Sequence, residues 1–350
     1  MKKNIYIAYT GGTIGMKPSE RGYITDIDFQ ERLEEKLPEL KEASMPAYQI
    51  GVYDPLLDSS NMTPKEWKKI ADDIQVRLDV ENYDGVVVLH GTDTMAYTAS
   101  ALAFMLEGLR KPVIVTGSQI PLCEIRNDAR DNIVTSLQIA SEHPVEEVCL
   151  YFNHNLLRGC RAVKINASGF EAFASPNYPP LGTVGVDFKI HVKQKLLFKY
   201  RGVKASLQVH NLEGPQVGVL RLFPGISARF VENALSELNG VVLQAYGVGN
   251  GPDQDKAFLR VLREAHDRGV VIVDCTQCLQ GNVNLTEYAA GSALADVGVI
   301  SGYDMTTEAA TAKLFYLLNQ GLPTQAVKRL LQISLRGELS EPDDDIANKV

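Results

Sequence analysis

The chain lacks the features of a membrane or secreted protein. Its N-terminal apolar stretch, residues 5–9, is only five residues long before Gly11 and Gly12 interrupt it. A signal peptide needs an apolar region of about 7–15 residues and a small-residue cleavage site. No window approaches the roughly 18 apolar residues of a membrane span. We therefore expect a cytoplasmic protein with no membrane partner.

Basic charge is also scarce. The chain has 35 Lys and Arg residues against 43 Asp and Glu residues, a formal net charge of −8, and no long basic run. Such a chain lacks the positive surface that binds a phosphate backbone or an anionic membrane. We expect no nucleic-acid partner, and the balance favours a small, neutral or zwitterionic ligand.

Cysteine is sparse and unevenly spaced. An odd count in a large chain is not typical of a disulfide framework. Cys275 and Cys278 form a lone C-x-x-C, for which we find no further zinc ligands; we interpret them as two buried thiols, and a redox role stays open. Six scattered histidines include no H-E-x-x-H. We expect neither a metal nor a cofactor. The five cysteines are Cys123, Cys149, Cys160, Cys275 and Cys278.

The chain does contain the alternation of strand and helix patterns that is typical of an α/β protein. Short, nearly continuous apolar runs alternate with helical patterns, as expected for parallel strands covered on both faces. The expected strands are residues 4–9, 85–90, 112–116, 147–152, 217–222, 240–245 and 269–274. The expected helices are residues 94–109, 128–142, 257–267 and 307–318.

A change of composition divides this pattern in two. Residues 175–185 carry three prolines and two glycines, and residues 186–213 are basic and weakly periodic. A chain of 350 residues also exceeds what most single cores hold. We predict a larger N-terminal α/β catalytic domain with a mostly parallel sheet flanked by helices (1–190), a linker (191–213) and a smaller C-terminal parallel α/β domain (214–350).

Residues 10–15, Thr-Gly-Gly-Thr-Ile-Gly, directly follow the first expected strand. Open parallel sheets bind ligands beyond the carboxyl ends of their strands, so the hydroxyl of Thr13 would lie at the mouth of the sheet. A simple tight turn explains the spacing about as well. The glycines do not fit a G-x-G-x-x-G dinucleotide loop, and no Walker lysine follows.

A second polar cluster, His90-Gly-Thr-Asp-Thr94, follows another strand of the same sheet and opens a helix. Thr92 and Asp93 would therefore face Thr13, although an N-cap alone explains Thr94. Lys164 lies between two apolar residues in a segment expected to be half buried. A threonine needs an activator to act as a nucleophile, and a buried lysine beside a carboxylate supplies one; a solvated lysine remains the common alternative.

Asp58, Ser59 and Ser60 form a polar triplet in a loop. A carboxylate and hydroxyls in this order can bind an ammonium and a carboxylate of a small ligand. Most such triplets, however, only make turns.

Taken together, these segments resemble the bacterial-type L-asparaginase family, and most of all its cytoplasmic type I members. Residues 10–15 and 90–94 look like the two signature segments, and residues 112–119 and 246–250 also look like family segments. The similarity extends to about residue 335. The resemblance implies hydrolysis of L-asparagine to L-aspartate and ammonia, with minor glutaminase activity possible in principle, in a homotetramer built as a dimer of dimers.

The resemblance also implies roles for single residues. Thr13 would be the nucleophile that forms a β-aspartyl-enzyme, and Thr92, Asp93 and Lys164 would handle protons. Tyr23 would close over the site from a mobile segment. The residues that would bind the substrate are Asp58, Ser59, Ser60, Thr92, Asp93 and, from a neighbouring subunit, Asn250.

One departure concerns regulation. Some type I enzymes carry an allosteric asparagine site with a threonine before the catalytic lysine and an arginine two residues before the Tyr-Gly-Val-Gly-Asn segment. This chain has Val163 and Gln244 there. Losing a hydroxyl and a guanidinium removes the best carboxylate ligands, so we expect weak or absent cooperativity.

Two other functions stay open at this point. One is an asparaginase-like amidotransferase subunit that supplies ammonia to a partner acting on transfer RNA. The other is an α/β module that binds a ligand without catalysis. Selectivity between asparagine and glutamine is also undecided, because one methylene is worth only about 1–3 kcal/mol of discrimination.

Overall fold

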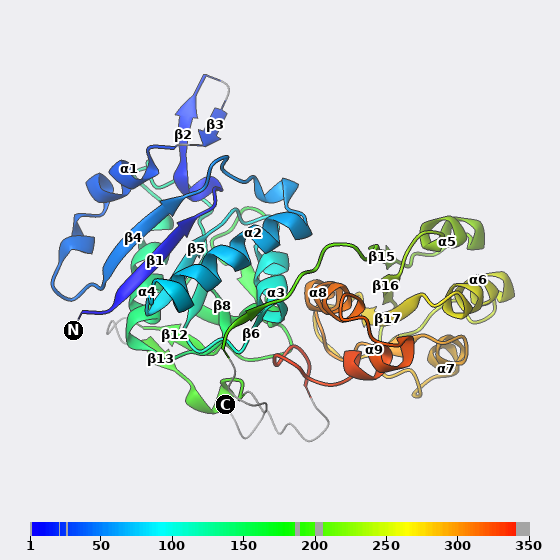
Figure 1. Ribbon diagram of the computed structural model, residues 1–350. Helices are drawn as coiled ribbons and strands as arrows, with labels where there is room; N and C mark the ends of the chain where they lie inside the picture. Colours follow the sequence, from blue (N-terminus) through cyan, green and yellow to red (C-terminus); the bar gives the residue numbers. More distant parts are fainter. Residues whose placement is uncertain (1, 21, 26, 186–189, 200–205, 341–350) are drawn as a thin grey trace. The chain divides into compact units, whose positions relative to one another are not determined.

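The computed structural model describes residues 2–20, 22–25, 27–185, 190–199 and 206–340. These residues divide into two compact units, of which the first runs to His210 and the second begins at Asn211. Both units are α/β, which confirms the predicted fold class (Figure 1). None of the helices in the described part combines the length and the apolar composition needed to traverse a lipid bilayer.

The first unit is built on an eight-stranded sheet with the order β13-β12-β9-β8-β7-β5-β1-β4. The five strands from β4 to β8 run parallel, and β9, β12 and β13 are added by antiparallel pairing. The strands in chain order are β1 (Asn4–Tyr9), β4 (Ala47–Val52), β5 (Gly85–Leu89), β7 (Val113–Thr116), β8 (Val148–Phe152), β9 (Asn155–Arg158), β12 (Gly182–Val184) and β13 (Ile190–Val192).

Helices cover both faces of this sheet (Figure 1). α1 (Phe29–Lys36) and α4 (Ala129–Glu142) bury Phe29, Leu33, Ile133 and Leu137 against Ile5 and Ile7 of β1. α2 (Pro64–Gln75) and α3 (Met95–Met105) pack together on the other face. The central strand β5 is completely buried, which explains why its sequence is a continuous apolar run.

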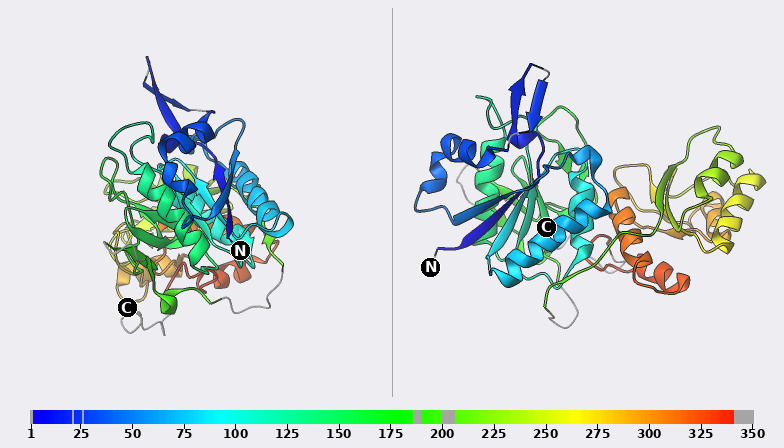
Figure 2. Two further views of the ribbon diagram at one scale, coloured as in Figure 1. Left: turned by 90° about the vertical axis from the view of Figure 1, so that its left-hand side faces the viewer. Right: turned by 45° about the horizontal axis from the view of Figure 1, so that its top comes forward.

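Three short strand pairs complete the unit. β2 (Met16–Ser19) and β3 (Gly22–Thr25) form a hairpin that projects from the sheet (Figure 2). β10 (Val163–Lys164) pairs with β11 (Phe173–Ala174), and β6 (Leu106–Glu107) pairs with β14 (Gln208–Val209). Much of the segment expected to be a linker, 191–213, therefore belongs to the first unit, because β13 and β14 hydrogen-bond to strands of that unit.

The helix expected at residues 94–109 ends earlier than predicted, at Met105. Leu106 leaves the helical conformation and pairs with Val209, and Gly108 has a φ of 79°. The apolar run that predicted a longer helix continues as a strand instead, since pairing with a distant segment satisfies its backbone.

The second unit contains a four-stranded parallel sheet with the order β15-β16-β17-β18. One face carries α5, α6 and α7, and the other carries α8 and α9. The strands are β15 (Val217–Arg221), β16 (Gly240–Ala245), β17 (Val271–Thr276) and β18 (Ile300–Ser301). The helices are α5 (Ala228–Leu235), α6 (Lys256–Asp267), α7 (Ala289–Asp296), α8 (Thr307–Leu318) and α9 (Thr324–Leu331).

The C-x-x-C pair of this unit is split between two environments. Cys275 on β17 is buried as expected, whereas Cys278 is exposed, so the prediction of two buried thiols was wrong for Cys278. The strand ends at Thr276, and the chain then leaves the core.

One ion pair is fully buried in the second unit. Lys313 Nζ lies 2.5 Å from Glu338 Oε1, and both side chains are 0% exposed. Burial by itself would raise the pKa of Glu338, but Lys313 and the backbone N–H groups of Leu335 and Arg336 outweigh it, so the pKa is lowered. The pair ties the segment after α9 to α8.

Asp274 on β17 is a second buried carboxyl, and its pKa shifts in the opposite direction from that of Glu338. Burial raises its pKa to about 8, and a smaller contribution from the Ala245 backbone opposes this. An unfolded aspartate titrates near about 3.9. Between these values the folded chain holds a proton that the unfolded chain has released. The contribution of Asp274 to the unfolding free energy is therefore fully present below about pH 4 and is lost as the pH rises towards 8.

Replacement of Asp274 by Asn should remove this dependence. Relative to Asp274→Asn, the wild type should lose about 1 kcal/mol of unfolding free energy per pH unit between about pH 5 and 8. Denaturant unfolding at a series of pH values measures this difference. Asp267→Asn, on the exposed end of α6, serves as the control, and parallel curves for wild type and Asp274→Asn would contradict the assignment.

Candidate functional site

The candidate site lies where the order of strands in the first sheet reverses direction. The chain passes from β1 to β4 on one side and then to β5 on the other side of β1. In a parallel sheet such a reversal opens a crevice beyond the carboxyl ends of the two central strands. The loops at that crevice follow β1 and β5, and they carry Thr13 and Thr92.

These two loops touch through glycines. Gly12 has a φ of 90°, and a Cβ on it would come within 2.4 Å of Gly91 N. A Cβ on Gly91 would come within 2.4 Å of Ser59 Oγ, in the loop after β4. Any side chain would force the loops apart, so the glycines allow Thr13, Thr92 and Ser59 to come from three neighbouring loops.

Thr13 begins a short 3-10 turn, Thr13–Gly15. Ile14 behind it is buried, and its carbonyl accepts a hydrogen bond from Leu122 N at 3.1 Å. Thr13 itself is half buried, and among the described residues its hydroxyl makes no hydrogen bond. A hydrogen bond thus anchors the turn next to Thr13, and no other described residue takes up the Thr13 hydroxyl.

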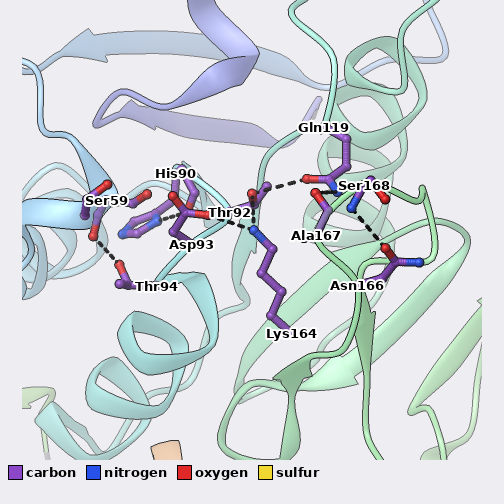
Figure 3. A network of polar contacts seen from close by, with 12 residues as sticks. Ser59, His90, Thr92, Asp93, Thr94, Gln119, Lys164, Asn166, Ala167 and Ser168 are labelled. Atoms are coloured by element: carbon purple, nitrogen blue, oxygen red, sulfur yellow. Dashed lines mark hydrogen bonds and ion pairs between the residues drawn. The ribbon is translucent and has the colours of Figure 1, made fainter.

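Lys164 reaches the site from a distant part of the chain. The antiparallel hairpin of β8 and β9 leads into the turn Gly159–Arg161, which packs on α3 and directs β10 to the start of that helix. Lys164 Nζ donates to Thr92 Oγ1 at 2.9 Å and to Asp93 Oδ1 at 2.8 Å (Figure 3). The structure thus brings together the three residues predicted to handle protons.

Burial differs strongly within this group. Thr92 is 7% exposed and the Lys164 side chain 20%, whereas the Asp93 side chain is 65% exposed. An ion pair with one partner in solvent contributes little to stability. The contact therefore orients Lys164 more than it holds the fold together.

A buried relay supports the loop that carries Thr92. Trp67 Nε1 donates to Thr98 Oγ1 at 3.0 Å, and Thr98 Oγ1 lies 3.0 Å from His90 Nε2. Because Gly91 O can only accept, His90 Nδ1 carries the hydrogen of the 2.7 Å bond to it, and Nε2 of the neutral ring accepts from the Thr98 hydroxyl. Burial lowers the pKa of His90 to about 4, so the ring is neutral at physiological pH.

The triplet after β4 is ordered by its own hydrogen bonds. Asp58 Oδ1 accepts from Ser60 N at 3.0 Å and from Ser60 Oγ at 2.9 Å. Ser59 is 4% exposed, and its carbonyl accepts from Thr94 Oγ1 at 2.7 Å. Thr94 occupies the N-cap position of α3 but makes no side-chain cap, because its hydroxyl bonds to Ser59 instead.

Two further predicted site residues belong to other elements of the chain. Tyr23 lies on β3 of the projecting hairpin, is 49% exposed, and donates from Oη to Glu124 Oε1 at 2.7 Å. Asn250 belongs to the second unit, where its backbone bridges to Tyr246 and its Oδ1 is buried. Within the described structure Tyr23 makes no hydrogen bond to Thr13, Thr92 or Lys164.

Gln119 is a site residue that the sequence analysis did not single out. It follows β7, the next strand along the sheet, and Thr92 Oγ1 donates to its Oε1 at 3.2 Å (Figure 3). The signal was present, because the strand-end rule that selected Thr13 and Thr92 applies equally to the loop after β7.

The relay behind the Thr92 loop can be tested by Thr98→Val, which keeps the shape and removes the hydroxyl. The variant breaks two buried hydrogen bonds, so the unfolding free energy should fall by about 1–3 kcal/mol in a denaturant titration. Thr311→Val is the control, since within the described structure that hydroxyl bonds its own helix alone, at Thr307 O. Equal losses in both variants would contradict a special role for the relay.

Comparison with known proteins gives matches along nearly the whole chain. Residues 4–197 match the family described as "Asparaginase, N-terminal", and residues 216–331 match the "Glutaminase/Asparaginase C-terminal domain". L-asparaginase 1 of Escherichia coli (strain K12) is 51% identical over 344 residues, which cover 98% of this chain and 99% of that protein.

Solved structures give the same result. L-asparaginase I from Vibrio cholerae O1 biovar eltor str. N16961 is 47% identical with a TM-score of 0.88, over 97% of this chain and 100% of that one. The thermostable L-asparaginase from Thermococcus kodakarensis is 31% identical with a TM-score of 0.85, over 97% and 99% of the two chains.

Proposed function

Because this chain belongs to the asparaginase family and is an L-asparaginase, we propose that it hydrolyses L-asparagine by a covalent double displacement on Thr13. Thr13 Oγ bonds to the side-chain amide carbon of asparagine, the carbon–nitrogen bond breaks, and ammonia leaves with the added proton. Water then attacks the β-aspartyl ester, which releases L-aspartate and restores the Thr13 hydroxyl. The Thr13 hydroxyl supports this assignment, because it makes no hydrogen bond within the described structure.

The observation that carries the proposal is the contact of Lys164 with Thr92 and Asp93 at the crevice between β1 and β5. A hydroxyl nucleophile must lose its proton and the departing nitrogen must gain one. Lys164 and Thr92 form a connected path for such transfers, and Asp93 holds the lysine in place. The turn after β1 and the start of α3 supply backbone N–H groups for the developing oxyanion.

The ends of the substrate have separate partners in this proposal. Asp58 and Asp93 attract its α-ammonium group, and Ser59 or Ser60 bonds its α-carboxylate. Tyr23 closes over the bound substrate, which requires it to exchange its hydrogen bond with Glu124. Asn250 completes the site of a neighbouring subunit.

The wider setting follows from the family. We propose a homotetramer, arranged as a dimer of dimers, that works in the cytoplasm without a cofactor. Minor activity on glutamine is included, because a substrate longer by one methylene is rejected only weakly by an apolar pocket.

Thr13→Ala tests the mechanism directly. Removing the nucleophile should lower ammonia release from asparagine by about a thousandfold or more. The thermal midpoint should stay unchanged, because the Thr13 hydroxyl makes no hydrogen bond within the described structure. Mass spectrometry of wild type mixed rapidly with asparagine should detect the acyl-enzyme, and the variant should show none.

Thr183→Ala, an exposed threonine on β12, serves as the control and should retain full activity. The assay also compares asparagine with glutamine and aspartyl peptides. Flat activity on all three substrates, or turnover retained in Thr13→Ala, would refute the proposal.

Steady-state kinetics should show little cooperativity. Val163 offers no hydroxyl, and the Gln244 amide is engaged with Thr307 Oγ1 at 2.7 Å, so neither provides the carboxylate ligand that an allosteric asparagine would need. A Hill coefficient near one in asparagine saturation is the expected result. A value clearly above one would show that the regulatory site has other ligands.

A further inference from the structure

We infer that Gln119 is a positioning residue for this reaction, which orients the Thr92 hydroxyl and ties it to the loop after Lys164. The inference rests on the proposed function, because it concerns the same proton path. It adds a side chain from a third strand-end loop, which follows β7.

The contacts of Gln119 determine which way its amide points. The side chain lies 3.3 Å from Ala167 O and 3.0 Å from Gly169 O through Nε2 (Figure 3). Carbonyl oxygens only accept hydrogen bonds, so the nitrogen must face them. The amide oxygen is left to face Thr92, where it can only accept.

That orientation determines the direction of the Thr92 proton. A lysine ammonium only donates, so Thr92 Oγ1 must accept from Lys164 Nζ at 2.9 Å. The single proton of Thr92 then goes to Gln119 Oε1 at 3.2 Å. One lone pair of the Thr92 oxygen remains for a donor from the crevice, either the nucleophile or the hydrolytic water.

The loop on the other side of Gln119 returns to Lys164. Asn166 Oδ1 accepts from Ser168 N and Gly169 N, each at 2.9 Å, and this turn presents the Ala167 and Gly169 carbonyls to Gln119. The hydrogen bonds and the chain form a closed ring from Lys164 through Thr92 and Gln119 back to Lys164. Any displacement of Lys164 relative to Thr92 therefore strains Gln119.

Gln119 is itself held from behind. Its backbone N donates to Asp128 Oδ2 at 2.9 Å, and Ile120 N donates to Asp128 Oδ1 at 3.0 Å. Asp128 also lies 3.4 Å from Asn132 Nδ2 on α4. The backbone that carries the Gln119 side chain is thus anchored at the start of α4, as positioning requires.

Gln119→Leu removes both ends of the amide. Thr92 would lose its acceptor and could donate into the crevice instead of accepting there. We expect kcat for asparagine to fall about tenfold, with KM changed less than about twofold. Gln75→Leu is the matched control, because Gln75 is also half buried and donates from Nε2 to a carbonyl, Leu207 O at 2.9 Å; it should keep wild-type kcat.

Gln119→Glu separates orientation of Thr92 from simple bracing of the loop. The introduced carboxylate still accepts from Thr92 but cannot donate to the two carbonyls, so kcat should lie between those of wild type and Gln119→Leu. Protonation restores the donor, and kcat relative to wild type should rise as pH falls from about 8 to about 5, towards the carboxyl pKa of about 4.3. This ratio carries the test even where Gln119→Leu fails to fold.

Three results would overturn the inference. The first is wild-type kcat and an unchanged pH profile in Gln119→Leu; the second is equal loss in both variants with no pH-dependent recovery in Gln119→Glu. In both of these cases the wild type and Thr13→Ala still behave as an asparaginase predicts, so the proposed function stands. The third is a wild type that releases no ammonia from asparagine, which overturns both proposals.

Discussion

Thr10 bonds twice to the carbonyl of Leu89, through its N–H at 3.1 Å and through its hydroxyl at 2.8 Å. These bonds extend the parallel pairing of β1 and β5 one residue beyond the strands and hold the two loops that follow at the same level. Leu57 N donates to Thr10 O at 2.6 Å and brings in the loop after β4. His90 N donates to Thr116 O at 2.9 Å and brings in the loop after β7. The geometry of the whole candidate site depends on this junction.

Two chains of hydrogen-bonded polar side chains lie beside that junction. The relay from Trp67 through Thr98 to His90 uses one hydroxyl to satisfy two side chains, and burial keeps the imidazole neutral. In the ring through Gln119, the Thr92 hydroxyl likewise satisfies two side chains: it accepts from Lys164 and donates to Gln119. In each case a neighbour with a single hydrogen-bonding role sets the direction: Gly91 O, which can only accept, for His90, and Lys164, which can only donate, for Thr92. With Lys164 protonated, this order leaves an acceptor lone pair of Thr92 for a donor from the substrate side, and the Thr92 hydroxyl changes partner when it passes a proton on.

The second unit illustrates two ways to bury a carboxyl. Glu338 faces Lys313 and backbone N–H groups, and its pKa is lowered despite burial. Asp274 faces little that compensates for lost hydration, and its pKa is raised to about 8. The difference shows that burial alone does not decide the charge of a group; its partners do.

The sequence was enough to predict the fold class and the strands β1, β5, β7 and β8. It also predicted that Thr13 and Thr92 follow strand ends. The continuous apolar runs and polar turns behind these predictions are local features of the sequence. The early end of α3 and the pairing of β14 with β6 could not be predicted from the sequence, because both depend on a partner strand about a hundred residues away. The same applies to Lys164, which lies 72 residues from Thr92 and reaches it only because the turn after β9 packs on α3. Gln119 shows the difference most clearly. Its position after a strand could be predicted from the sequence, but its role depends on three loops that come together only in the folded sheet. Sequence by itself determined which residues stand at strand ends, through local periodicity. Only the tertiary structure decided which of these residues hydrogen-bond to one another, because hydrogen bonds form at about 3 Å and the order of the strands determines which loops lie that close together.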